Sequence, residues 1–240
     1  MGWTWQSSLR ERPYRPGEGF PDTHAPSTPT FLRLALREVR PGTRVLDLGC
    51  GAGRVGVALG EAGGLLVGLD VAAPAVTAAR TAAVRAGLTQ ARFFQADAET
   101  VELPRVTGWE AADVAVAHFC YSRRLLEQAA SFLRPGGAMI CCAIHPAQWR
   151  ETARPSRFAV NEAEVEAHAT AAGLLPEAAV RETERLRLTG WGEARAYLVA
   201  AGLWEKWVGE SRGEALEAAF AAGGRILTIR SSLLCKLRRP

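Results

Sequence analysis

The sequence predicts an α/β fold, a three-layer sandwich in which helices cover both faces of a mostly parallel sheet. Three observations support this prediction. Short apolar runs alternate with segments of helical periodicity between residues 31 and 146. The runs are apolar throughout, as expected of strands that helices bury on both faces. A glycine-rich turn, "GCGAG" at 49–53, joins one apolar run to the helical segment that follows it.

The elements of this core follow one another in a regular order. A helix over 30–40 comes first, and Pro41 and Gly42 end it. Pro74 stands in the first turn of a later helix and Gly87 at its end, where these residues are favoured. We expect strands at 44–49, 65–70, 91–97, 111–119 and 138–144, and helices at 54–64, 74–88 and 123–133, with "RPGG" at 134–137 as a turn.

The second half of the chain is less regular. Asn161 and Glu164 form a capping-box pattern at the start of a helix over 161–174. Two β-type segments, 178–188 and 225–237, are expected to pair antiparallel at the edge of the sheet, with two helices between them.

Three parts of the chain follow from this order. Residues 1–30 are rich in Pro, Gly and aromatic residues without a period, and we expect an irregular N-terminal arm. We expect residues 31–146 to form the α/β core, and 147–240 to hold the C-terminal part of the sheet with cap helices inserted at about 190–223.

Composition narrows the class of protein. The chain has 240 residues, 48% hydrophobic and 22% charged, and no apolar run approaches the length of a membrane span. Five cysteines without a CxxC pattern, and the absence of a signal-peptide core, indicate a reducing cytoplasm. The net charge of +4 suits an acidic partner, but the arginines are scattered among acids, which disfavours nucleic acid without excluding it. We expect no membrane partner, and the oligomeric state is unknown.

The glycine turn predicts a binding site for a nucleotide-like ligand. Glycines let the backbone approach a ligand closely, and the helix that follows offers free N–H groups. The segment 51–56, "GAGRVG", matches the dinucleotide fingerprint, which is a weak signal alone. The carboxylate of Asp70, at the end of the next strand, is placed to bind ribose hydroxyls, whether the ligand is a dinucleotide or another nucleotide-like molecule. Asp47 would repel a pyrophosphate but suits a cationic amino acid group, and Asp97 is placed to accept from an adenine amino group.

Five segments resemble the class I S-adenosylmethionine-dependent methyltransferases. The family implies a seven-stranded sheet with an antiparallel last strand, and S-adenosylmethionine as cofactor. The segments are "VLDLGCGAGRVGVAL" at 45–59, "VGLDVAAPAVTAAR" at 67–80, "FFQADAE" at 93–99, "DVAVAHF" at 113–119 and "LRPGGAMICCAI" at 133–144.

The resemblance also implies the cofactor-binding residues. The three glycines would face the methionine part, and Asp47 would orient their loop or contact the amino group. Asp70 would bind the ribose, and Val71 would pack on the adenine. The next strand ends would read the adenine edge and close over the sulfonium. The full set is Asp47, Gly49, Cys50, Gly51, Gly53, Asp70, Val71, Asp97, Ala98, Ala117 and His118.

The class of methyl acceptor follows from the motifs that the sequence lacks. "AHFCYS" at 117–122 lacks the proline-containing motif that the DNA and RNA adenine-N6 enzymes share, and Cys120 lacks the neighbouring proline of a cytosine-C5 nucleophile. No set of residues has metal-ligand spacing, so we expect no metal. These absences favour a small-molecule acceptor. The alternatives are an RNA or protein methyltransferase, a cofactor-binding relative without acceptor chemistry and, remotely, an NAD-dependent oxidoreductase.

A general base is needed only if the acceptor must lose a proton. His118 and His145 follow the fourth and fifth strands of the core, whose carboxyl ends open onto the ligand side of a parallel sheet. We rank His118 first, His145 second, and add Tyr121 as a third catalytic candidate. His24 falls in the N-terminal arm, and His168 is expected on a solvated helix face. Aromatic residues of the cap and arm, including Trp3, Trp5 and Tyr14, are candidates for lining an acceptor pocket.

Overall fold

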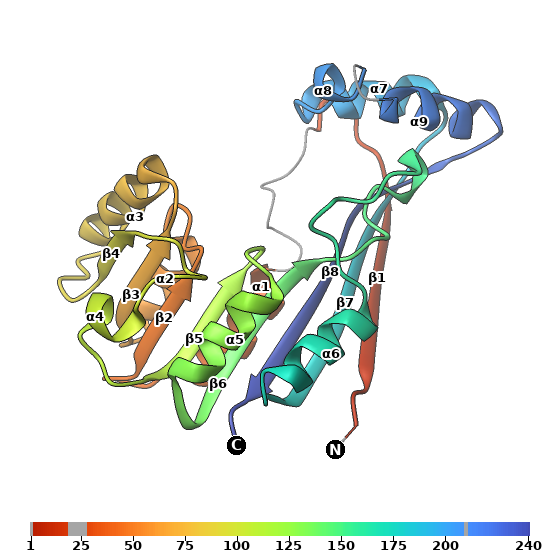
Figure 1. Ribbon diagram of the computed structural model, residues 1–240. Helices are drawn as coiled ribbons and strands as arrows, with labels where there is room; N and C mark the ends of the chain where they lie inside the picture. Colours follow the sequence, from red (N-terminus) through yellow and green to blue (C-terminus); the bar gives the residue numbers. More distant parts are fainter. Residues whose placement is uncertain (1, 19–27, 209–210) are drawn as a thin grey trace.

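The computed structural model describes residues 2–18, 28–208 and 211–240, which form one eight-stranded sheet covered by helices (Figure 1). The strand order is β1-β7-β8-β6-β5-β2-β3-β4. The strands are β1 (Trp5–Pro13), β2 (Arg44–Leu48), β3 (Leu65–Asp70), β4 (Arg92–Gln95), β5 (Ala112–His118), β6 (Leu133–Ile144), β7 (Leu175–Arg187) and β8 (Ile226–Arg238). Strands β6, β5, β2, β3 and β4 run parallel, whereas β8 is antiparallel to both β6 and β7. The predicted mostly parallel sheet with an antiparallel last strand is confirmed.

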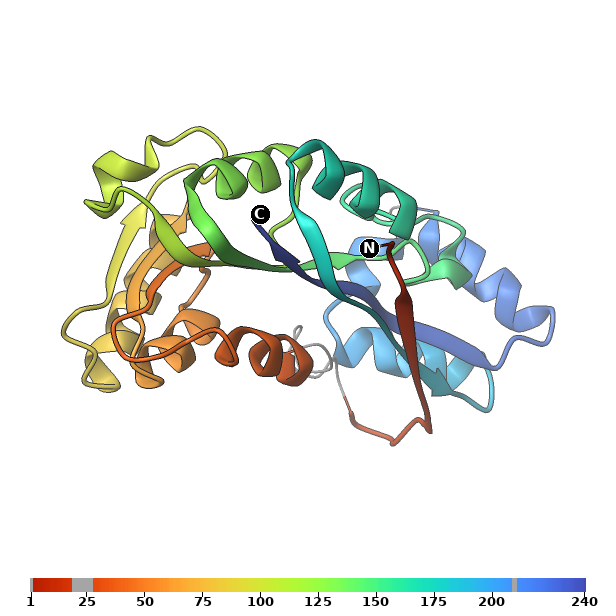
Figure 2. The same ribbon diagram turned by 90° about the horizontal axis from the view of Figure 1, so that it is seen from below.

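The helices form two layers around the sheet (Figure 2). One apolar core contains residues of α1, α2 and α3, and the other contains residues of α4, α5 and α6. The central strands contribute alternate residues to the two cores, so Val114 and Val116 of β5 face α1 to α3 while Ala115 and Ala117 face α4 to α6. The helices are α1 (Thr28–Leu36), α2 (Arg54–Glu61), α3 (Ala73–Arg85), α4 (Leu103–Thr107), α5 (Arg123–Phe132) and α6 (Glu162–Ala171), with a 3-10 turn η1 (Arg150–Thr152).

The N-terminal arm is not irregular as predicted, because residues Trp5–Pro13 form β1, an eighth strand parallel to β7. Its side chains are mostly exposed, so it lacks the apolar alternation by which a strand is recognised in sequence. The pairing depends instead on the backbone ladder and on ion pairs: Arg12 contacts Glu184 at 3.0 Å and Arg187 contacts Glu11 at 2.9 Å. Met1 and residues 19–27 of the predicted arm, including His24, lie outside the described residues.

The segment between β7 and β8 is a cap of three helices rather than the two predicted. They are α7 (Trp191–Ala200), α8 (Trp204–Val208) and α9 (Arg212–Ala221). Gly202, at a φ of +66°, ends the first of them, where a left-handed residue stops a helix. The cap has its own apolar core, in which Tyr197 and Trp207 are buried. It lies beyond the ends of β7 and β1, on the side of the sheet where the parallel strands end (Figure 1).

One local prediction is confirmed and another is corrected. Asn161 caps α6 and forms the predicted capping box with Glu164, the two side chains each accepting a backbone N–H at the start of the helix. The "RPGG" segment, predicted as a turn, belongs instead to the start of β6, where the register against β5 shifts. No helix in the described part of the chain has the length and apolar character needed to cross a bilayer.

Candidate functional site

The glycine loop connects β2 to α2 and contains three glycines with positive φ angles: 70° at Gly49, 51° at Gly51 and 82° at Gly53. An added Cβ at Gly49 would lie 2.4 Å from the Cβ and Sγ atoms of Cys120, and one at Gly53 would lie 3.0 Å from Ala79. At Gly51 it would meet nothing within 4 Å. Gly49 and Gly53 are therefore required by packing as well as by conformation. Gly51 leaves open space in front of its backbone, where a ligand can approach closely.

Asp70, the last residue of β3, holds this loop in place. Its Oδ2 accepts the backbone N–H of Gly51 at 2.9 Å, and its Oδ1 accepts the N–H of Ala72 at 2.9 Å. Each carboxylate oxygen retains capacity for a further hydrogen bond. One side chain thus fixes the glycine loop to the start of α3 and still has acceptor capacity at the carboxyl edge of the sheet.

Asp47 is buried at the end of β2, with 1% of its surface exposed. Its Oδ2 accepts no hydrogen bond from any residue in the described ranges. Burial raises the pKa of Asp47 to about 7, and the nearby charge of Asp70 adds to this effect, while a backbone hydrogen bond from Gly56 opposes it. A buried carboxylate with an unused oxygen fits a cationic ligand, which would favour its ionised form.

Four carboxylates surround one thiol at this edge of the sheet. Burial raises the pKa of Cys120 to about 11, and the charges of Asp70, Asp47, Glu99 and Asp97 raise it further, in that order. The thiol is protonated at neutral pH, which makes it a poor nucleophile. Burial likewise raises the pKa of the Cys50 thiol in the glycine loop.

Glu99 was missed by the sequence analysis. Its carboxylate accepts the hydroxyl of Ser122, the N-cap residue of α5, and its backbone N–H donates to Asp97 Oδ1 at 2.9 Å. The only signal in the sequence is a second acid two residues after Asp97. Together with Asp47, Asp70 and Asp97 it gives the site a negative charge, which suits a positively charged ligand.

Val71 and Ala98 flank these acids differently. The side chain of Val71 is exposed at 65%, an apolar surface directly after Asp70. Ala98 is buried in the core against α5, so its backbone is the part that is available to a ligand. Ala117 is fully buried within β5.

His118 ends β5 on the face of the sheet that α1 covers. Its ring lies 4.7 Å from the ring of Phe31 and 4.7 Å from that of Phe119. Phe119 has a φ of +58°, which is a strained conformation for a bulky residue. The strain falls where the chain leaves β5, next to the glycine loop.

His145 lies on the opposite face of the sheet, against α6. Its Nδ1 accepts the backbone N–H of Ala147 at 3.1 Å and contacts Ser231 Oγ at 3.2 Å. Its Nε2 lies 3.1 Å from Glu162, whose other oxygen binds Arg181 at 3.0 Å. Burial lowers the pKa of His145, although the neighbouring Glu162 opposes this. Both ring nitrogens are engaged, so accepting a proton from a substrate would disrupt this network.

Tyr121 and His168 form a pair. The Tyr121 hydroxyl lies 3.2 Å from His168 Nδ1, and burial raises the pKa of Tyr121. The expectation that His168 lies on a solvated face is wrong, because its ring packs half-buried against Tyr121. Trp3 and Trp5 do not face the glycine loop either. They stack on each other, and Trp5 Nε1 donates to Glu166 of α6 at 2.7 Å.

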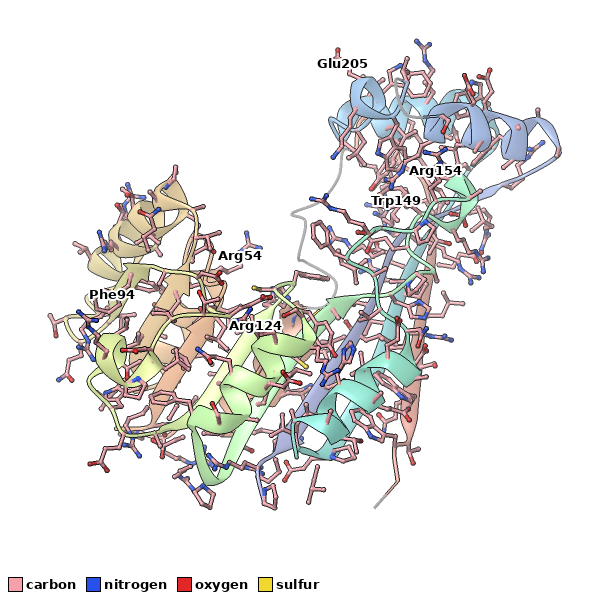
Figure 3. All side chains as sticks on the ribbon, viewed as in Figure 1. Arg54, Phe94, Arg124, Trp149, Arg154 and Glu205 are labelled. Carbon is pink, nitrogen blue, oxygen red and sulfur yellow. The ribbon has the colours of Figure 1, made fainter. Side chains whose placement is uncertain are left out.

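Two arginines lie near the acidic site. Arg54 directly follows the glycine loop, and Arg124 lies in the first turn of α5 (Figure 3). Arg154 lies farther away, beneath the cap, close to the position of Trp149 (Figure 3). The site therefore combines acidic residues at the strand ends with two nearby basic residues, Arg54 and Arg124.

The fold and the glycine loop define an α/β protein of the Rossmann-like class, with an acidic site at the carboxyl ends of its parallel strands that fits a cationic ligand. The model of the family described as "Methyltransferase domain" matches residues 40–202. The chain belongs to this family.

The similar curated proteins are methyltransferases that differ in the acceptor they are named for. Ribosomal protein L11 methyltransferase of Thermus thermophilus is 32% identical over 40% of this chain and 37% of its own length. The 23S rRNA (uracil(1939)-C(5))-methyltransferase RlmD of Pseudomonas aeruginosa is 39% identical over 39% of this chain and 20% of its own. The chain thus spans well under half of these curated relatives.

Solved structures match over nearly the whole fold. The YcgJ protein of Bacillus subtilis has a TM-score of 0.64 and 19% identity, and the match covers 88% of this chain and 98% of that one. A methyltransferase from Geobacter sulfurreducens in complex with S-adenosyl-L-homocysteine has a TM-score of 0.57 and 20% identity, covering 90% and 93%. At these identities the likeness shows the fold.

Proposed function

We propose that this protein transfers the methyl group of S-adenosylmethionine to a small-molecule acceptor in the cytoplasm. The observation that carries the proposal is the cap. Three helices with a shared aromatic core are inserted between β7 and β8 and lie at the same edge of the sheet as the glycine loop. Such an insertion restricts access to the acceptor side and favours a compact acceptor. The five cysteines are all free thiols, which supports a reducing compartment.

The acidic site supports a specific cofactor arrangement. The cofactor supplies a methyl group on a positively charged sulfur atom. We infer that Asp47 stabilises the cationic amino acid end and that Asp70 accepts from the ribose hydroxyls with its remaining lone pairs. Val71 provides an apolar surface for the adenine, and Asp97 an acceptor for its amino group. The loop and the strand ends complete the site with Gly49, Cys50, Gly51, Gly53, Ala98, Ala117 and His118.

The chain's own contribution to the reaction is mainly positional. Methyl transfer from a sulfonium is an in-line displacement, and alignment alone supplies a large part of the acceleration. Where the acceptor must lose a proton, we propose His118 as the base. Its ring lies at the end of β5, beside Phe31 and Phe119. His145 ranks second because accepting a proton there would disrupt its contacts with Ala147 and Glu162. The raised pKa of Tyr121 makes that residue a hydrogen-bond donor at neutral pH.

RNA or protein remains the second candidate acceptor. The similarity to the ribosomal protein and rRNA methyltransferases favours it, together with the arginines around the site. These matches span about 40% of this chain, so they do not extend to its whole acceptor side. A relative that binds the cofactor but methylates nothing is the third candidate.

These candidates are distinguished by whether metabolites, RNA or protein receive the transferred methyl group. The purified chain is incubated with methyl-labelled S-adenosylmethionine and a cell extract separated into metabolites, RNA and protein. We expect label in the metabolite fraction. Label in RNA or protein would contradict the small-molecule proposal, and cofactor binding without any label transfer would support the third candidate.

A further inference from the structure

A pocket of about 620 Å³, called the basic pocket below, lies between the cap and the loop that leads from η1 to α6. Its described lining residues come from the loop and from helices α8 and α9. The charged and aromatic ones are Arg154, Arg157, Phe158, Lys206 and Arg212.

The described charged side chains that line this pocket are all basic. Four of its lining side chains are cationic, and none of the described ones is acidic. Arg154, Arg157 and Lys206 form no ion pair within the described ranges, whereas basic residues elsewhere do, as Arg12 does with Glu184 and Arg238 with Glu177. Glu205, the neighbour of Lys206, projects from the outer side of the cap (Figure 3). Gathering like charges is unfavourable unless an anion offsets them.

An exposed aromatic ring adjoins these cations. Phe158 is exposed at 62%, and the Arg157 guanidinium lies 4.6 Å from the centre of its ring. Arg212 stacks on the ring of Trp207 in the same way, at 5.8 Å. The pocket therefore offers an apolar ring surface beside guanidinium groups, and guanidinium groups bind carboxylates and phosphates with paired hydrogen bonds.

Backbone pairing places the loop directly beyond the end of β5. The N–H of Phe119 donates to the carbonyl of Cys142 at 3.0 Å, and the N–H of Val160 donates to the carbonyl of Ile144 at 2.9 Å. Carbonyls two residues apart on a strand point to the same side, and β8 occupies the other side of Ile144. Residues 159–160 thus continue the line of β5 past His118.

A short segment joins the pocket to this edge of the sheet. Arg154 lies five positions before Ala159, which pairs with Ile144, and such a segment spans at most about 18 Å when fully extended. An acceptor with its charged group in the pocket would extend along this segment toward the carboxyl end of β5.

We propose that this pocket binds a carboxylate or phosphate group of the methyl acceptor, so that the acceptor is an organic anion with an apolar, ring-sized portion against Phe158. The inference rests on the proposed small-molecule methyltransferase function and specifies its substrate class. Arg154 and Arg157 are specificity-determining residues in this scheme, and they act on the acceptor rather than on the cofactor.

Binding of simple aryl anions tests the proposal without turnover. Calorimetry on the full chain saturated with S-adenosylhomocysteine uses phenyl phosphate and phenylacetate as anionic probes and benzyl alcohol as the neutral probe. We expect at least one anion to bind, about tenfold or more weaker in Arg154→Gln/Arg157→Gln, with benzyl alcohol weak throughout. Comparison of the two anions identifies the preferred group. The control, Arg37→Gln/Arg85→Gln, removes the same charge from exposed positions outside the pocket and should behave as wild type.

Several results would overturn the inference. They are equal anion affinity in the pocket variant and wild type, equal loss in the control pair, no binding of either anion, or arginine-dependent binding of an RNA oligonucleotide without binding of phenyl phosphate. An unchanged affinity for S-adenosylhomocysteine and an unchanged melting temperature show that the variant is folded. Because the probes need no methyl transfer, this test can fail while label still enters metabolites, and it can succeed while the label goes elsewhere.

Discussion

The backbone N–H of Gly51 donates to Oδ2 of Asp70 across 2.9 Å, joining the glycine loop to the end of the neighbouring strand. Asp70 also accepts from Ala72, so one carboxylate orders both turns that border the cofactor site. Ligand binding at this edge therefore depends on Asp70 twice, through the conformation of the loop and through its remaining acceptor capacity.

Replacement of Asp70 should weaken cofactor binding. We expect Asp70→Ala to reduce S-adenosylmethionine affinity about tenfold or more, the scale of one lost charge-assisted hydrogen bond, measured by calorimetry. Asp70→Asn keeps one oxygen acceptor and should lose less. Unchanged affinity in Asp70→Ala would mean that the ribose is bound by other residues.

Asp47 should make stability and cofactor binding depend on pH. Its pKa is raised to about 7, so the folded protein binds this proton more tightly than the unfolded chain. Its contribution to the free energy of unfolding is therefore greatest below about pH 4 and is lost as the pH rises toward 7, by at most about 1.4 kcal/mol per pH unit. Denaturant unfolding of wild type and Asp47→Asn across this range isolates the effect, since the variant lacks the titrating group.

A cationic ligand favours the ionised form of Asp47. At pH 6 we expect S-adenosylmethionine binding to release protons, up to about one per site, detected by calorimetry in buffers of different ionisation enthalpy. Asp47→Asn should release fewer. Equal proton release by the two proteins would remove Asp47 from the cofactor site.

Replacement by alanine should have different effects at Gly49 and at Gly51. Gly49→Ala places its Cβ 2.4 Å from Cys120, so the loop must move and both stability and cofactor binding should fall. Gly51→Ala meets no neighbour and should cost about 1–2 kcal/mol, the left-handed penalty alone, while its methyl enters the space left for the ligand. Urea unfolding and cofactor titration separate the two effects. A Gly51→Ala protein with full cofactor affinity would show that the ligand does not pass there.

The sequence was sufficient for the parts of this protein whose signals are local. The strand–glycine–helix unit at 44–61 and the capping box at Asn161 are each specified by residues that lie close together in the sequence. The sequence does not reveal β1, because its side chains are mostly exposed and its contacts with β7 are the backbone ladder and ion pairs rather than apolar packing. Its fit depends on Glu184, more than 170 residues away, which no periodicity reveals.

The acceptor side was predicted least well, for a related reason. The cations of the basic pocket come from positions 154 to 212 and meet only after the cap has folded. His168 was assigned to solvent because the hydrophobic pattern of its helix does not show that Tyr121 lies opposite. The carboxylate of Glu99 is held by Ser122, the N-cap residue of α5, which is more than 20 positions away in the sequence.

Removal of the first strand should lower stability rather than abolish cofactor binding. Deleting residues 1–13 exposes the edge of β7 and breaks the contacts of Trp5 with Glu166 and of Arg12 with Glu184. We expect a lower melting temperature and self-association, because an unpaired edge strand is prone to pairing with other chains. Scanning calorimetry and light scattering measure both. Cofactor affinity at low temperature should stay within a few-fold of wild type, and a complete loss would place β1 in the cofactor site.

The proposed role of His118 as general base is tested by measuring the rate of methyl transfer. If it removes a proton from the acceptor, His118→Ala should lower kcat about 10²-fold or more while cofactor affinity changes only a few-fold. Because Phe31 and Phe119 both pack on its ring, a stability loss is expected as well, so activity is compared at a temperature where both proteins are folded. Phe31→Leu serves as the packing control, since it disturbs the same contact and leaves the imidazole. A pH–rate profile that loses its acidic limb in His118→Ala, but keeps it in Phe31→Leu, identifies the base. An Ala variant with the full rate would mean that alignment alone suffices for this acceptor.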